Sequence, residues 1–285
     1  MQAQWIHNCF PQIETQDMCL LVFAHRVYPG FPLVLAANRD EYYARETAPS
    51  SFWPDHPDLL AGRDLAAGGT WMGITRRGRF AAVTNYRDPK VTARAARSRG
   101  ELPLDFLIDS ATAPEYLGEI AGREQDYAGF NLLLGDGQDL WYFSNRDEGA
   151  GGTPHSPQRL SPGIYGLSNA SLNTPWPKVE LGRKRLQQLL GNSCPSHDTL
   201  LGLVNDRAQA TAEQLKLNGL ETAMEQALSP QFILAGEYGT RSSTTMWIDE
   251  GGEVNWRELS FDHCGEVSAT QQHRFEITHL RAGCE

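Results

Sequence analysis

The chain has 285 residues, with 25 Lys or Arg against 35 Asp or Glu, so its formal net charge is −10. This length is enough to bury most of the apolar surface within one large domain, and the acidic balance argues against nucleic acid or an anionic membrane as partner. The 5 cysteines are scattered, with no C-x-x-C pair and no metal-ligand spacing, so they imply neither a disulfide framework nor a zinc site.

Residues 1–17 have neither strand nor helix periodicity, so we expect a disordered extension or a start codon assigned too far upstream. They lack the basic and apolar regions of a signal peptide, and nothing later approaches the ~18 apolar residues of a membrane-spanning helix. We therefore predict one domain over residues 18–285, located in the cytoplasm, with no membrane span. The oligomeric state stays open.

Short apolar runs rich in strand formers occur in pairs, separated by turn residues that are typical of hairpins. In chain order these predicted strands cover residues 19–24, 33–37, 70–74, 79–84, 130–134, 140–144, 164–167, 243–248 and 254–259. A glycine-rich bend is expected over residues 62–69, and helices are expected over residues 102–120, 176–190 and 198–204. Paired strands with helices grouped between them favour an α+β fold of stacked antiparallel sheets covered by helices.

Cys19 directly follows a methionine, and an initiator methionine before a small residue is normally removed. A chain that starts at Cys19 has a free α-amine, whose ordinary pKa of ~7.7–8.0 suits it to act as general base for the thiol of the same residue. The alternative is a buried strand cysteine that behaves as a small hydrophobic residue.

Polar side chains follow several of the apolar strands. The tetrapeptide Asn38-Arg39-Asp40-Glu41 ends the second predicted strand, and the other polar residues in comparable places are Asn85, Asn169 and Arg241, the last in a turn before a strand. Each is individually consistent with an ordinary turn residue. As a set, they are candidates for a common site.

Three strings carry a resemblance to a known family: CLLVFAHRVYPGFPLVLAANRDEYYAR, GGTWMGITRRGRFAAVTNYR and SNASLNTPWPK. They resemble the NRDE proteins, which include the transport and Golgi organisation type 2 proteins, and the resemblance extends from Met18 essentially to the C-terminus. That family is similar to cysteine N-terminal-nucleophile hydrolases such as penicillin V acylase and bile-salt hydrolase. The fold that the resemblance implies is a four-layer αββα sandwich.

The resemblance also implies roles for individual residues. By motif, Cys19 matches the nucleophile, Asp40 the carboxylate near the α-amine, Asn85 an oxyanion-hole amide, Asn169 a second active-site amide and Arg241 a late-chain arginine. The hydrolases have an arginine just before the Asn-x-Asp pattern, where this chain has Ala37. Arg39 inside the pattern either lowers the pKa of the thiol or pairs with a neighbouring carboxylate. Asn38, Glu41 and Trp71 are assigned to substrate binding, with a core position as the alternative for Trp71.

Two functions follow from these assignments. The first is a cysteine amidohydrolase or acyltransferase that acts on a small amide or thioester, a hydrolase of non-peptide C–N bonds. The alternative is a non-catalytic carrier or chaperone of a hydrophobic small molecule such as haem or a lipid, because the family is linked to haem trafficking. Both functions use the same pocket and a small-molecule partner, and neither needs a resident cofactor.

Two further groups of polar residues are weighed against plain structural roles. Asp262-His263-Cys264 carries metal-capable side chains, but neighbours on a strand point to opposite faces, so no metal site is expected. A basic run is expected to be a solvated face, with docking of an anionic substrate tail as the alternative; it comprises Lys90, Arg94, Arg97 and Arg99.

Overall fold

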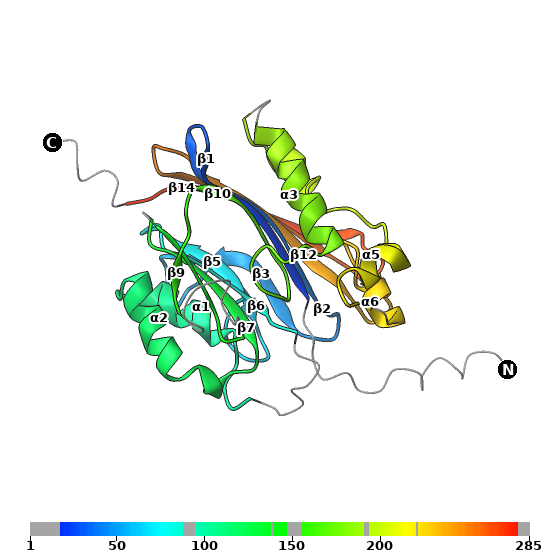
Figure 1. Cartoon of the computed structure of the whole chain (residues 1–285). Coiled ribbons are helices and arrows are strands. Elements are labelled where there is room, and N and C mark those ends of the chain that lie inside the picture. Colours follow the sequence, from blue (N-terminus) through cyan, green and yellow to red (C-terminus); the bar gives the residue numbers. More distant parts are fainter. Residues whose placement is uncertain are drawn as a thin grey trace.

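Figure 1 shows the computed structural model, in which two β-sheets lie face to face between layers of helices. The structure describes residues 18–87, 95–137, 139–146, 156–190, 194–220 and 222–278. The expectation for residues 1–17 lies outside the described residues.

Both sheets are antiparallel, with seven strands each among the described residues. The first has the order β10-β1-β2-β12-β13-β14, and β11 also pairs with β12. Its strands are β1 (Cys19–Tyr28), β2 (Phe31–Tyr42), β10 (Gly163–Leu167), β11 (Leu234–Ala235), β12 (Tyr238–Ile248), β13 (Glu253–Phe261) and β14 (Val267–Glu276). The second sheet follows chain order and contains β3 (Thr47–Phe52), β4 (Leu59–Asp64), β5 (Met72–Thr75), β6 (Phe80–Asn85), β7 (Phe130–Gly135), β8 (Leu140–Ser144) and β9 (Gln158–Arg159).

Helices cover the outer faces of both sheets. They are α1 (Glu101–Ile108), α2 (Ala113–Gly122), α3 (Pro177–Leu190), α4 (His197–Leu201), α5 (Ala212–Lys216) and α6 (Ala223–Ala227). Helix α1 packs on β5 and β6, and α3 packs on β1 and β10 (Figure 1). Helix α2 packs on β8, and α4 packs on β2 and β12. In the part of the chain that the structure describes, no helix is long and apolar enough to cross a membrane.

Three apolar clusters separate the four layers. The middle cluster joins inward side chains of both sheets, for example Leu21 and Phe23 of β1 with Met72 of β5. Alternate residues of β1, such as Leu20 and Val22, belong instead to the cluster under α3. A strand buried on both faces needs apolar residues at successive positions, which explains the unbroken run in β1. The predicted four-layer αββα sandwich is confirmed.

Some element boundaries differ from the expectation. The helix predicted over residues 102–120 is two helices, because Thr112 starts α2 with a capping box: its side chain accepts from the Glu115 amide, and the Glu115 carboxylate accepts in return. The glycine-rich bend expected over residues 62–69 begins within β4. Strands β3 and β14 were not predicted, because their polar, partly exposed residues lack an apolar run.

Candidate functional site

The register of the β1–β2 hairpin sets the surroundings of Cys19. Cys19 lies directly opposite Arg39, and residues opposite each other in an antiparallel pair project to the same face. That face borders a pocket with a volume of about 840 Å³, which both residues line. Cys19 itself is only 4% exposed in the chain that retains the preceding residues.

Most of the residues singled out from the sequence meet at this pocket. Those that line it are Cys19, Arg39, Asp40, Trp71, Asn85, Asn169 and Arg241. They come from β1, β2, β6, β12 and two loops, and therefore from segments more than 200 residues apart in the chain.

Asn38 and Glu41 do not line the pocket. The buried Asn38 amide donates to the carbonyls of Val204 and Gln231, at 2.8 and 2.7 Å, and accepts from Ser243 at 2.6 Å. These bonds give Asn38 a structural place between strands and loops, so its assignment to substrate binding is corrected. Glu41 is 1% exposed and its carboxylate lies 3.4 Å from the Arg39 guanidinium. It therefore forms an ion pair with an arginine that lines the pocket.

The main chain at Cys19 is held from three sides. The Cys19 amide nitrogen donates to Asn169 Oδ1 at 3.1 Å, and the Cys19 carbonyl accepts from Ser168 Oγ at 2.7 Å. One residue earlier, the Met18 nitrogen donates to the Tyr238 hydroxyl at 2.5 Å, and the Met18 carbonyl accepts from the Asp40 amide at 2.9 Å. The Met18–Cys19 peptide bond is therefore part of the site.

Asn85 presents a buried amide nitrogen with no hydrogen-bond partner among the described residues. Its backbone carbonyl accepts from Asn169 Nδ2 at 3.0 Å, which ties the end of β6 to the residue that holds the Cys19 nitrogen. An unsatisfied buried donor costs about 1–3 kcal/mol. The Asn85 amide is thus available to an acceptor atom that enters the pocket.

Asp40 is fully buried beneath the start of β1. Its Oδ1 accepts from the Thr240 hydroxyl at 2.6 Å, while its Oδ2 has no partner among the described residues. Burial raises the pKa of Asp40 to about 6, against the opposing effects of Lys178 and Thr240. The carboxyl group therefore changes charge close to neutral pH.

Arg241 lies within β12 and not in the turn that was expected. The register between β2 and β12 shifts between Thr240 and Ser242, so Arg241 is the extra residue of a β-bulge. Its guanidinium donates to the carbonyls of Tyr42 and Arg45, at 2.7 and 3.0 Å. The bulge turns an arginine from a central strand toward the pocket.

Two buried charged residues near the site were not predicted from the sequence. Lys178 in α3 interacts electrostatically with Asp40 and Cys19, although a lysine in a helix ordinarily indicates a solvated face. Glu258 in β13 lines the pocket and accepts from the Ser50 amide at 2.7 Å. The strand periodicity of β13 could have placed Glu258 on the same face as Trp256, which is fully buried.

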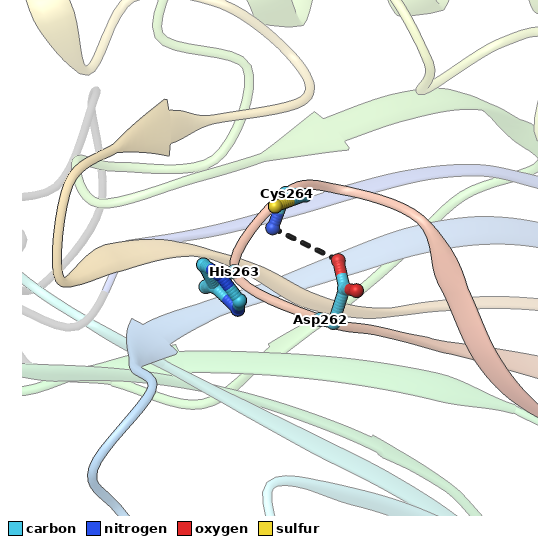
Figure 2. A group of neighbouring side chains, drawn as sticks. All are labelled: Asp262, His263 and Cys264. Atoms are coloured by element: carbon cyan, nitrogen blue, oxygen red, sulfur yellow. Dashed lines mark hydrogen bonds between the residues drawn. The ribbon is translucent and has the colours of Figure 1, made fainter.

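Figure 2 shows Asp262, His263 and Cys264 in the turn between β13 and β14. The strand geometry expected for them is wrong, and their ligand atoms lie within 4.8 Å of one another. Asp262 Oδ1, however, accepts from the amides of Cys264 and Glu266, at 2.8 and 3.0 Å, and so holds the turn itself.

The basic run is only partly described. Lys90 and Arg94 lie outside the described residues, whereas Arg97 and Arg99 line the pocket. Arg97 pairs with Glu101, and Arg99 donates to the Gly129 carbonyl at 3.2 Å. The expectation of a solvated face is confirmed for Arg97, which is exposed, whereas Arg99 is half-buried.

Two solved structures are similar to the chain at low identity. An N-acylethanolamine-hydrolyzing acid amidase ortholog from Caenorhabditis elegans is 11% identical with a TM-score of 0.46, and 80% of this chain and 92% of that chain are covered. A mutant conjugated bile acid hydrolase from Clostridium perfringens is 10% identical with a TM-score of 0.40, and the coverage is 91% and 93%.

The sequence relatives are much more similar. Transport and Golgi organization protein 2 homologs from Bos taurus and Homo sapiens are 35% and 34% identical, over 85% of this chain and 93% of each relative. The Drosophila melanogaster protein of that name is 26% identical, over 61% and 65%. The family model described as Transport and Golgi organisation 2 matches residues 18–263. The chain belongs to the transport and Golgi organisation 2 family.

Proposed function

We propose that this protein is a cysteine amidohydrolase or acyltransferase of the N-terminal-nucleophile kind, acting on a small amide or thioester. The observation that carries the proposal is the unpartnered amide nitrogen of Asn85 in the pocket that Cys19 also lines. A thiol nucleophile and a preorganised donor on one pocket are two of the groups that acyl transfer requires.

The proposal requires that the mature chain begin at Cys19. The Cys19 nitrogen is otherwise part of a peptide bond and too weakly basic to take a proton. Removal of the residues through Met18 converts it into an α-amine. Asn169 Oδ1, which already accepts from this nitrogen at 3.1 Å, is in place to orient the amine.

The reaction then proceeds in two halves. The α-amine takes the thiol proton, and the thiolate forms a C–S bond to the substrate carbonyl while Asn85 donates to the oxyanion. The α-ammonium returns its proton to the leaving amine or thiol as the scissile bond breaks, which leaves an acyl thioester on Cys19. Water, or an acceptor amine in the transferase, attacks this thioester with the α-amine again as base, and the thiol is restored.

One observation favours the non-catalytic carrier as a second candidate. Met18 is only 5% exposed, and its backbone nitrogen and carbonyl are both hydrogen-bonded, so the unprocessed chain fits the fold. A chain that keeps Met18 has no α-amine at Cys19. The pocket volume of about 840 Å³ lies within the usual range for small-molecule sites, and a carrier would hold its ligand, such as haem or a lipid, in this same pocket.

The test compares two forms of the protein against a panel of acyl amides and thioesters. One form is the whole chain, and the other is expressed from Met18, with its N-terminus at Cys19 checked by intact mass. We expect turnover from the second form only, and its loss by at least about 10³-fold in Cys19→Ala. Cys194→Ala, at an exposed cysteine, is the matched control and should retain full activity.

Equal turnover by Cys19→Ala and its parent would refute the catalytic proposal. So would recovery, from the native source, of only chains that retain Met18. Undiminished ligand binding by such chains, without turnover, would support the carrier.

A further inference from the structure

Lys178 is a lysine in an unfavourable place. It is 3% exposed and lies in the first turn of α3, where the aligned peptide dipoles disfavour a positive charge. Among the described residues its Nζ donates only to the Leu228 carbonyl, at a long 3.5 Å. A buried ammonium group without a strong partner destabilises a fold, so its position needs a compensating charge nearby.

The β1–β2 register identifies that charge. Cys19 and Arg39 share one face of the hairpin, and the Asp40 amide bonds to the Met18 carbonyl, so the side chains of Asp40 and Met18 lie on the other face, although both residues also contribute to the pocket wall. Helix α3 packs on this face of β1, and Met18 and Lys178 line one small cavity. Asp40 Oδ2 is buried without a partner among the described residues, and Asp40 and Lys178 interact electrostatically.

Several other titratable groups face the pair. Arg87 is near Lys178 but is paired with Glu225 of α6, and the Arg39 guanidinium acts on Asp40 from the pocket side. Burial lowers the pKa of Lys178, and both Asp40 and Cys19 oppose that change. Asp40 also interacts electrostatically with the hydroxyl of Tyr43. Burial raises the pKa of Tyr43, so this hydroxyl stays neutral.

We propose that Lys178 is a positioning residue whose buried ammonium group keeps Asp40 ionised and favours the unprotonated form of the Cys19 α-amine. The inference rests on the proposed mature N-terminus. Once Met18 is removed, the new α-ammonium, Asp40 and Lys178 form a group of two positive charges around one negative charge. Repulsion from Lys178 makes the α-ammonium more acidic, while attraction keeps the carboxylate charged to lower pH. The repulsion extends the nucleophilic state of Cys19 toward acid, whereas the retained carboxylate attracts the α-ammonium and offsets part of that effect.

The test follows the rate of Cys19 alkylation by iodoacetamide against pH, in protein that begins at Cys19. Labelling slows at low pH, where the nucleophilic state of Cys19 is lost, and this acid limb of the rate profile should move upward by about one pH unit when the charge is removed in Lys178→Met. At a given pH on the limb, labelling should then be about tenfold slower. Lys178→Arg should keep the limb near its original position. Lys184→Met, at an exposed lysine of the same helix, is the matched control and should change nothing.

Labelling needs no substrate, so this result is independent of turnover. If Lys178→Met unfolds like its parent and its acid limb does not move, the inference is overturned even if the enzyme is active. If the limb moves but no turnover is found, the inference stands and the proposed function is removed. Should Lys178→Met fail to fold, Lys178→Gln and the parent protein still decide the matter. A parent limb at the ordinary α-amine value of ~8 would also overturn the inference.

Discussion

The unpartnered amide of Asn85 allows stability and catalysis to be separated. In Asn85→Ala the buried Nδ2 is deleted, but the backbone carbonyl that accepts from Asn169 remains. Because the lost donor has no hydrogen bond in the folded protein, its removal should leave the free energy of unfolding unchanged or raise it by up to about 1–3 kcal/mol. Denaturant unfolding of the variant and its parent measures this difference.

The same substitution should severely impair catalysis. Loss of one oxyanion donor lowers turnover by about 10²–10³-fold, or about 2.7–4 kcal/mol in the transition state, while ground-state affinity changes little. Steady-state kinetics with any substrate from the panel should therefore show a reduced kcat and a nearly unchanged KM.

Asn131→Ala is the matched control for the stability effect. The Asn131 amide is fully bonded: it donates to Thr84 Oγ1 at 3.0 Å and to the Ala170 carbonyl at 3.1 Å, and it accepts from the Tyr142 hydroxyl at 2.8 Å. Its removal should destabilise the protein by on the order of 2–4 kcal/mol. If Asn85→Ala destabilises the fold as much as Asn131→Ala and leaves turnover intact, the amide is structural and the oxyanion argument is wrong.

Two more substitutions test the charges and contacts around the site. Burial raises the pKa of Asp40 to about 6, so the folded protein binds this proton more tightly than the unfolded chain and loses stability as pH rises from about 4 to about 6. In the chain that retains Met18, Asp40→Asn should gain on the order of 3 kcal/mol relative to its parent across that window in denaturant unfolding; a pH-independent difference would contradict the assignment. Asn38→Ala should lower the free energy of unfolding by on the order of 2–4 kcal/mol, since two carbonyls and one hydroxyl lose their partner, and an unchanged midpoint would show that these bonds contribute nothing.

Local patterns in the sequence were sufficient to predict the central hairpin of the first sheet. The apolar runs around residues 19–24 and 33–37, joined by a turn, predict the hairpin that became β1 and β2. The alternation of side chains along β2 also separates Arg39 and Glu41 from Asn38 and Asp40. These are short-range constraints of backbone geometry, and they hold in any fold that contains the strand.

The sequence did not reveal which face of β2 borders the pocket. Both faces of the strand are buried, so its pattern of hydrophobic residues does not distinguish the face toward the pocket from the opposite face. The pairing of Cys19 with Arg39 decides it, and this pairing puts Asn38 among structural hydrogen bonds instead of substrate contacts.

Contacts between distant segments settled the remaining features. Arg241 reaches the pocket because a bulge in β12 shifts its register against β2, and a bulge depends on the partner strand. Lys178 is buried because α3 packs on β1 beside Asp40, although its own neighbours in the chain are typical of a surface helix. Strand order, register and helix packing determine which charges are removed from water, and that desolvation, which no local pattern encodes, sets the protonation of this site.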